Sequence, residues 1–391
     1  MKSLQTLALA ALACAAPFAP DAAAQTRYAT LYTYTNSFPV GLTLGKDVLY
    51  GALASGCGVI FELEPPNSAD GPWTEATLYS FRSEADACDP YFGPILGTSG
   101  VLHGLTNGGG TYGFGALYEL QPPASPGDPW TESVPFSFGA PGSGISEPVS
   151  RLVPGPNGSF YVLASGGVFG GGALVQLRPP ASPGGFWSSS VLYSFPTGAP
   201  PVGLMMGAHG ALYGTTLYNN YGPGLVFQLT PPTAPGEVWT ETVIYSPTSG
   251  STPNSLTAGP GGILYGTAYG TGEFPGRAEV FQLTPPESSG GSWTYALLRR
   301  LGVDPLESPL LLQGGKLYTT NNANHGGALL ELDPPSAPGS AWTVKVLHEF
   351  PDNGQVPGGA LVMDKRGAIY GATTVTYMQP NSGSVYRYAT R

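Results

Sequence analysis

Six tryptophans recur at intervals of about fifty residues, and this spacing constrains the fold more than any other feature of the chain. They stand at positions 73, 130, 187, 239, 293 and 342, so the intervals are 57, 57, 52, 54 and 49 residues. The surrounding sequence repeats with them: GLVFQLTPPTAPGEVWTETVIYS at 224–246 has copies at 115–137 and 327–349. A period of this length is typical of a supersecondary unit stacked in an array.

Each unit contains four segments with the character of β-strands. One unit reads PVGLMMG at 201–207, ALYGTT at 211–216, GLVFQLT at 224–230 and WTETVIYS at 239–246. The third segment alternates large apolar residues with others, which is the period of two that a strand shows. Pro231 and Pro232 end this segment, because proline cannot donate to a sheet ladder. We find no run of helical periodicity after residue 24.

The two ends of the chain are offset in a way that predicts a closed ring. The second and third strands each occur seven times, whereas the fourth strand, which begins with Trp, occurs six times. The missing copy is RYATLYTY at 27–34, ahead of the first unit. An N-terminal strand that completes the C-terminal unit removes the last open edge. We therefore predict an all-β fold, a seven-bladed β-propeller of four-stranded antiparallel blades; a parallel β-helix is the less favoured alternative.

The repeated motifs resemble the tandem repeats of the Gloeobacter/Verrucomicrobia type, the GloVer repeats. The matching stretches are LYSF at 192–195, LYGTT at 212–216 and GLVFQLT at 224–230, and the resemblance spans nearly all of 27–391. It implies an exported bacterial propeller, secreted or held at the surface, and it supplies no catalytic residue. Many relatives carry a C-terminal anchoring segment; this chain ends in SVYRYATR, which favours free secretion.

Charge and composition limit the classes of partner. The formal net charge is −10, only 10% of residues are charged, and no Lys/Arg cluster is longer than Arg299-Arg300. Binding to a phosphate backbone or to an anionic membrane needs a basic face, so we expect neither nucleic acid nor a membrane surface as partner. The 58 Gly and 41 Pro residues are periodic and lie between the aromatic runs, so they indicate turns of a folded chain.

The first 24 residues have the features of a secretory signal. Lys2 precedes an apolar segment from Leu4 to about Phe18, and a run of three alanines ends at Ala24, where we expect cleavage. Lipidation at Cys14 is a weaker interpretation, because the apolar stretch before it is short. We predict a signal peptide at 1–24, a single propeller domain at 25–391, no membrane span and a secreted, extracellular protein, with the periplasm as the other expected location.

Two cysteines remain after this cleavage, Cys57 and Cys88. In a propeller, Cys57 falls in a loop between second and third strands, and Cys88 falls in the connector to the next blade, so both lie on one face of neighbouring blades. An oxidising compartment favours a disulfide between them, which we predict. Two unpaired thiols are the alternative.

Residues that break the repeat are candidates for function. Arg151 stands at an innermost-strand position where the other units have Gly41, Pro94, Gly203, Ser255, Pro309 and Ala360. Its guanidinium can grip a carboxylate or sulfate from the channel, or it can pair with nearby Glu147. His103 replaces a tyrosine found in the other six units, which favours a buried histidine in a tyrosine-shaped place over a catalytic base.

Carboxylates and aromatic residues gather in the loops expected at the mouth of the ring. As ligand-binding candidates we name Arg151, Glu147, Glu84, Asp86, Tyr91 and Asp304, and as weak catalytic candidates Asp89, Glu307 and His325. Paired carboxylates serve as acid and base on a glycosidic bond, but the same groups also bind sugars without cleaving them. The simpler explanation is that these charged side chains lie in exposed loops and interact only with water.

Two functions remain open at this point. The favoured one is a binding or scaffold module for a glycan or a cell-surface protein, because no metalloprotease, phosphate-loop, calcium-loop or nucleophile-elbow motif occurs in the sequence. The alternative is an extracellular polysaccharide lyase or hydrolase; a structural role in a surface layer is a third. We expect no metal and no cofactor, and a monomer.

Overall fold

The structure is a computed structural model. It describes residues 27–390 except for the following: 69–70, 83–85, 126, 183–184, 198–199, 218–223, 235–236, 248–250, 271–277, 289, 302–307, 322–325, 338–339, 352–354 and 376–381.

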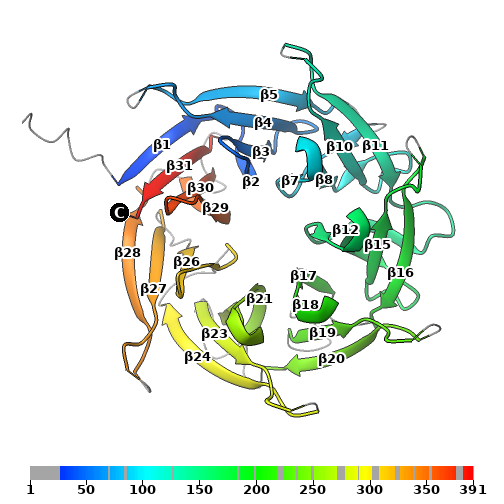
Figure 1. Cartoon of the computed structure of the whole chain (residues 1–391), viewed down its shortest axis with the longest axis vertical. Coiled ribbons are helices and arrows are strands. Elements are labelled where there is room, and N and C mark those ends of the chain that lie inside the picture. Colours follow the sequence, from blue (N-terminus) through cyan, green and yellow to red (C-terminus); the bar gives the residue numbers. More distant parts are fainter. Residues whose placement is uncertain are drawn as a thin grey trace, which may run out of the picture.

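The described strands form seven antiparallel blades around a central axis, which confirms the predicted fold (Figure 1). Blade 1 comprises β2 (Pro39–Leu44), β3 (Leu49–Leu53), β4 (Val59–Glu64) and β5 (Thr74–Ser80) from the axis outward. Blade 2 comprises β7 (Ile95–Leu96), β8 (Leu102–Thr106), β10 (Ala116–Gln121) and β11 (Thr131–Ser137). Blade 3 comprises an inner strand in two pieces, β12 (Ile145–Pro148) and β13 (Val153–Pro154), then β14 (Phe160–Gly166), β15 (Ala173–Arg178) and β16 (Ser188–Ser194).

The remaining blades follow the same order. Blade 4 comprises β17 (Pro201–Met206), β18 (Leu212–Thr216), β19 (Val226–Thr230) and β20 (Thr240–Tyr245). Blade 5 comprises β21 (Ser251–Ala258), β22 (Leu264–Gly270), β23 (Ala278–Thr284) and β24 (Thr294–Leu301). Blade 6 comprises β25 (Leu311–Gln313), β26 (Lys316–Asn321), β27 (Ala328–Asp333) and β28 (Thr343–Glu349). Blade 7 comprises β29 (Gln355–Met363), β30 (Ala368–Val375), β31 (Ser384–Ala389) and, as its outer strand, β1 (Tyr28–Thr33).

The ring is closed by the N-terminal strand, as predicted from the offset ends. β1 pairs antiparallel with β31, so that Tyr28 lies opposite Tyr388 and Thr33 lies opposite Ser384. The first strand of the chain therefore completes the last blade (Figure 1). This pairing removes the open edge that a linear array would leave.

The loops divide between two faces of the ring. We call the mouth face the one that carries the loops between second and third strands, such as 54–58 and 107–115, and the connectors between blades, such as 81–94. The opposite hairpin face carries four short 3-10 turns, Thr98–Gly100, Pro156–Gly158, Ala208–Gly210 and Pro260–Gly262. Of the described residues, none forms a helix long and apolar enough to cross a membrane.

The recurring tryptophan is explained by contacts between neighbouring blades. Trp130 of blade 2 packs edge-on against Tyr50 of blade 1, with ring centroids 6.1 Å apart. The same pair recurs around the ring as Trp239 with Tyr161, Trp293 with Tyr213, Trp342 with Tyr265 and, across the closure, Trp73 with Tyr370. At these five interfaces one blade supplies the Trp and its neighbour supplies the Tyr. The period of the sequence is the period of this contact.

A second repeated contact lies inside blades 1, 2, 4, 5 and 7, where a third-strand ring covers the glycine of the second strand. Phe61, Phe227 and Phe281 cover Gly51, Gly214 and Gly266, so closely that a Cβ at these glycines would clash with the ring. Blades 2 and 7 have Tyr118 and Tyr386 in this place. Both rings are fully buried, and neither hydroxyl has a hydrogen-bond partner among the described residues.

We therefore expect the Tyr118→Phe variant to be more stable than the wild type, by about 1 kcal/mol, because it removes a buried hydroxyl that forms no bond. Urea denaturation followed by tryptophan fluorescence measures this difference. Phe227→Tyr is the matched opposite change and should lower the free energy of unfolding. Loss of stability in Tyr118→Phe would mean that the hydroxyl has a partner, such as a buried water.

Candidate functional site

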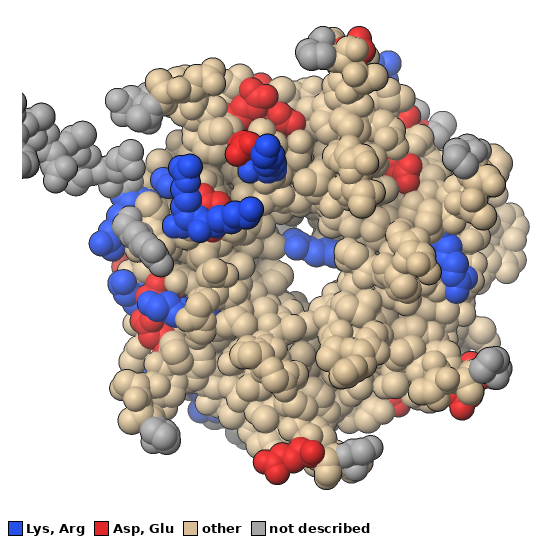
Figure 2. Space-filling model, viewed as in Figure 1, with Lys and Arg blue, Asp and Glu red and all other residues tan. Residues whose placement is uncertain are grey.

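An open channel runs along the central axis of the ring (Figure 2). A cavity of about 410 Å³ is lined by inner-strand residues of several blades, including Arg151, Gly203, Ser255, Pro309 and Ala360. These are five of the seven positions compared in the repeat; Gly41 and Pro94 are not among the lining residues. Figure 2 shows the opening at the centre of the ring, with largely uncharged surface around it.

A second cavity of about 730 Å³ adjoins the first on the mouth face. It extends over Asn107 of blade 2, Glu147 to Val149 of blade 3, and Leu217 of blade 4. Tyr91, Phe92, Val202 and Asn254 line both cavities. The two cavities are therefore parts of one site, which runs from the channel outward over blades 2 to 4.

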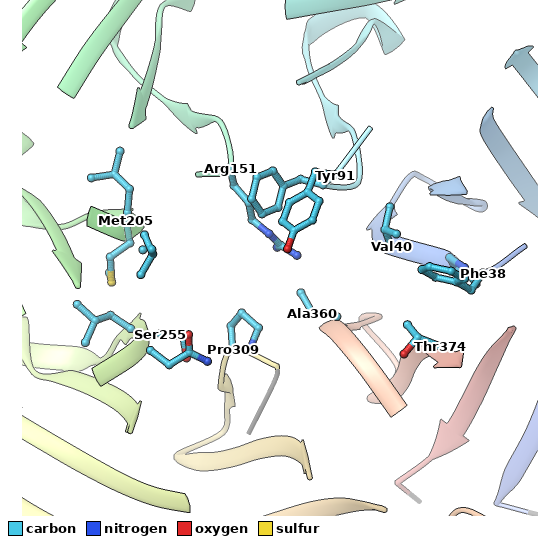
Figure 3. A pocket seen from close by; sticks show the side chains of 17 residues that line it. Phe38, Val40, Tyr91, Arg151, Met205, Ser255, Pro309, Ala360 and Thr374 are labelled. Atoms are coloured by element: carbon cyan, nitrogen blue, oxygen red, sulfur yellow. The ribbon is translucent and has the colours of Figure 1, made fainter. Parts of the chain in front are cut away.

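Of the described residues that line the channel cavity, Arg151 alone is charged. Its side chain points into the channel beside Tyr91 (Figure 3). Surrounding protein displaces water from the guanidinium, and this burial lowers its pKa from the ordinary value. An arginine keeps its charge under these conditions, so the channel holds a permanent, poorly hydrated cation.

The sequence around Arg151 breaks the inner strand of blade 3 and aims this side chain at the axis. β12 and β13 both pair with β14, but residues 149–152 between them leave the regular ladder. Ser150 substitutes for the missing backbone acceptor, because its hydroxyl accepts a hydrogen bond of 2.9 Å from the backbone N–H of Leu163. The irregular segment thereby stays attached to the blade while Arg151 extends into the channel.

Arg151 forms no ion pair with any residue that the structure describes, Glu147 included. The alternative that these two residues neutralise each other is therefore wrong. Glu147 is exposed and lines the outer cavity, whereas Arg151 lines the channel. A half-buried cation with no counterion among the described residues is costly, so its presence indicates a role other than stability.

Tyr91 and Phe92 extend over the channel mouth from the connector between blades 1 and 2. Their rings meet edge to face, with centroids 5.0 Å apart, and 58% of Tyr91 is exposed. Next to them, Gly93 touches Gly41 so closely that a side chain at either position would clash with the backbone of the other. This contact fixes the end of the connector against the inner strand of blade 1.

The other end of the connector is held by a Cys57–Cys88 disulfide, as predicted. The Cα atoms of the two cysteines lie 4.4 Å apart. Cys88 also belongs to β6 (Ala87–Cys88), which pairs with β9 (Gly108–Gly109), and the N–H of Asp89 donates to the carbonyl of Cys57 over 2.8 Å. The aromatic pair at the mouth is therefore carried by a segment fixed at both ends.

The structure separates the two aspartates of this connector. Asp89 is exposed, with a left-handed φ of 64°, and Asp86 lies between the outer strands of blades 1 and 2, where it accepts a hydrogen bond of 3.0 Å from the Tyr79 hydroxyl. Neither carboxylate is among the residues that line the two cavities. Glu84, Asp304, Glu307 and His325 lie outside the described residues.

Asp86 forms an acidic cluster with Glu132 that the sequence did not suggest. Burial, and next the charge of Asp86, raise the pKa of Glu132 to about 7. One oxygen of Glu132 is buried and has no hydrogen-bond partner among the described residues. Two ionised carboxylates can only accept hydrogen bonds, so a proton on Glu132 gives the pair with Asp86 a donor. The cluster joins two blades, and it lies away from the channel.

This shifted pKa predicts a pH dependence of stability. Between about pH 4.5 and pH 7 the folded protein holds a proton on Glu132 that the unfolded chain has lost, so its free energy of unfolding falls as the pH rises. Glu132→Gln removes this slope. We expect wild type and variant to diverge by about 1 kcal/mol across this range, a value reduced for partial exposure to solvent. Chemical denaturation at a series of pH values measures this difference. If the free energy of unfolding had the same pH dependence in wild type and variant, the raised pKa of Glu132 would be contradicted.

His103 occupies the place of the repeat tyrosine, and its surroundings are structural. Its ring lies against Phe160 and Trp187, the same interblade contact that tyrosine makes elsewhere, and Nδ1 lies 3.4 Å from Glu119. Among the described residues, no group of three or more His, Cys, Asp or Glu side chains is placed to hold a metal ion. Sequence reasoning missed Phe92 and Asn254 at the site; Asn254 directly precedes the compared position Ser255, so extending the comparison by one residue would have found it.

The fold and the channel place this chain in the class of repeat-built, seven-bladed β-propellers with an open axial channel. The family model of the Gloeobacter/Verrucomicrobia repeat matches residues 41–276, more than half of the sequence. The chain belongs to this repeat family. A comparison with curated protein sequences found no match.

Solved structures with this fold come from proteins of several kinds. A puromycin-hydrolysing peptidase of Mycobacterium tuberculosis is 16% identical with a TM-score of 0.59, and the match covers 92% of this chain and 52% of that one, so this chain spans about half the peptidase. An ulvan lyase of a new polysaccharide lyase family is 12% identical with a TM-score of 0.58, over 89% and 91% of the two chains. The virginiamycin B lyase of Staphylococcus aureus is 16% identical with a TM-score of 0.52, over 92% and 99%. At such identities the likeness establishes the fold alone.

Proposed function

We propose that this protein is an exported binding module that takes an anionic, extended ligand at the mouth of its channel. The observation that carries the proposal is Arg151, a half-buried cation that has no counterion among the described residues and points into an open cavity. A guanidinium in this setting is ready to bind a carboxylate or sulfate in bidentate fashion. The ligand then supplies the negative charge that the described residues lack at this point.

The surroundings of Arg151 favour a polysaccharide as the ligand. Tyr91 presents an exposed ring at the mouth, and a flat aromatic face suits the C–H face of a sugar ring. Asn107 and Asn254 in the cavity walls have side-chain amides, a type of group that both donates to and accepts from hydroxyls. An ulvan lyase of the same fold was solved with a GlcA(1-4)Rha3S unit bound, which makes acidic glycans a sensible first class to test.

Asp89, the catalytic candidate that the structure describes, lies outside both cavities. A lyase or hydrolase needs a proton-transfer group beside the reacting bond, and of the described lining residues Tyr91 and Glu147 carry such a group. Fold likeness to lyases does not carry a reaction across at this level of identity. We therefore place the polysaccharide-active enzyme second and let the experiment distinguish the two.

Export is part of the same proposal. The first 24 residues have the pattern of a secretory signal, and the disulfide is typical of an oxidising compartment outside the cytoplasm. We propose that residues 25–391 act as one secreted domain.

The proposal is tested by incubating the purified protein with a panel of neutral and acidic polysaccharides, and following retention and chain cleavage in the same samples. We expect retention of acidic members without cleavage, weakened by salt because the contact is ionic. Cleavage of any member would establish the enzyme instead. Retention of none would reject a glycan ligand and direct the search to protein partners.

A further inference from the structure

The site has two charges of opposite sign at different depths. Arg151 lies in the channel, and Glu147 lies at the rim of the adjoining outer cavity. Since the two cavities share Tyr91, Phe92, Val202 and Asn254, a ligand long enough to leave the channel toward blades 3 and 4 passes Glu147. The inference below rests on the proposed function and specifies its ligand.

The separation of the two charges is set by the chain between them. They are four residues apart and form no ion pair within 4.0 Å, so the guanidinium and the carboxylate act on different parts of a ligand. Four residues span at most roughly 14 Å even when fully extended. Glu147 therefore faces a sugar unit that lies near the unit bound to Arg151.

We propose that the site selects acidic glycans in which charged and uncharged units alternate, and that Glu147 rejects polymers with a charge on every unit. Arg151 attracts the charged unit. Glu147 repels a second carboxylate that reaches the outer cavity, whereas it accepts hydrogen bonds from the hydroxyls of an uncharged unit. Specificity of this kind needs a repulsive element as well as an attractive one, and the two charges supply both.

The rest of the outer cavity fits this assignment. The other residues that line it, Asn107, Pro148, Val149, Val202, Leu217, Asn254 and the Tyr91–Phe92 pair, are all uncharged. No described cation in that cavity is available to hold a second carboxylate or to offset Glu147. The described residues of the site therefore offer a cation, Arg151, to only one charged unit of the ligand.

The test compares two polymers, hyaluronate, which has one carboxylate per disaccharide, and polygalacturonate, which has one on every unit. We expect the wild type to bind hyaluronate more tightly, and Glu147→Gln to raise the affinity for polygalacturonate by about 3- to 10-fold at low salt, as a like charge at this range requires. Affinity for hyaluronate should change less than about 2-fold. The gain should shrink in 0.5 M salt, since screening removes it.

The matched control is Asp47→Asn, which changes the net charge equally but lies exposed in the β2–β3 hairpin on the opposite face. It should leave the preference between the two polymers unchanged. Equal binding of both polymers by the wild type and by Glu147→Gln would overturn the charge-pattern selectivity and leave the proposed function standing. Binding of neither polymer would overturn both.

Discussion

Arg151→Met is expected to weaken the binding of an acidic polysaccharide at least 30-fold and, in the same protein, to raise the stability of the fold. Removing one partner of a buried, charge-assisted pair costs about 2–5 kcal/mol of binding free energy. The free protein, in contrast, loses a cation that is half-buried and has no described counterion. We expect its free energy of unfolding to rise by about 1 kcal/mol, since an apolar side chain fits this wall at a lower cost.

The opposite signs of these two effects make the prediction specific. Isothermal titration or biolayer interferometry gives the affinity, and thermal or urea denaturation gives the stability. Arg151→Lys serves as the control because it keeps the charge but loses the planar fork, so it should bind about tenfold more weakly than the wild type. If Arg151→Met is destabilised, the guanidinium has a structural partner, and the proposal of a ligand anchor fails.

Opening the Cys57–Cys88 disulfide is expected to lower the free energy of unfolding by roughly 3–4 kcal/mol. The two cysteines are 31 residues apart, and the cross-link limits the freedom of the unfolded chain over that length. The Cys57→Ser/Cys88→Ser variant should match the wild type treated with a reductant, as measured by urea denaturation. Equal stability of the reduced and oxidised proteins would contradict this expectation.

The same variant should also bind acidic polysaccharide more weakly, because the disulfide holds one end of the connector that carries Tyr91 and Phe92 to the channel mouth. The contact between Gly41 and Gly93 still fixes the other end. We therefore expect a moderate loss of about 3- to 10-fold, which reflects the ordering of freed side chains on binding. Unchanged affinity at a lowered stability would show that the aromatic pair is held by its other contacts.

Much of the architecture could be predicted because the physical cause of the repeat is local in sequence. Each Trp packs on an aromatic ring of the preceding blade, Tyr50 for Trp130 and His103 for Trp187, so the spacing of the tryptophans counts blades directly. The unmatched strand at 27–34 has one use in a ring, and the structure places it there. The disulfide and the channel position of Arg151 followed from the same repeat, because equivalent residues in a propeller occupy equivalent places.

The relations between charged groups could not be predicted, because they depend on distances between blades. The sequence does not show whether Glu147 and Arg151 meet, because two residues four positions apart lie side by side in a helix or turn. In the structure the broken inner strand of blade 3 keeps them apart. The cluster of Asp86 with Glu132 joins residues 46 positions apart through the packing of two outer strands. The shared lining of the two cavities likewise depends on which side chains leave space unfilled.

A crystal structure of the protein with a hyaluronate tetrasaccharide tests the central claim most directly. We predict a uronate carboxylate within hydrogen-bond distance of the Arg151 guanidinium, a sugar ring against Tyr91, and an uncharged unit beside Glu147. A sugar bound on the hairpin face would contradict the account. So would an ion pair in the channel between Arg151 and a carboxylate of the protein, such as Asp304 or Glu307.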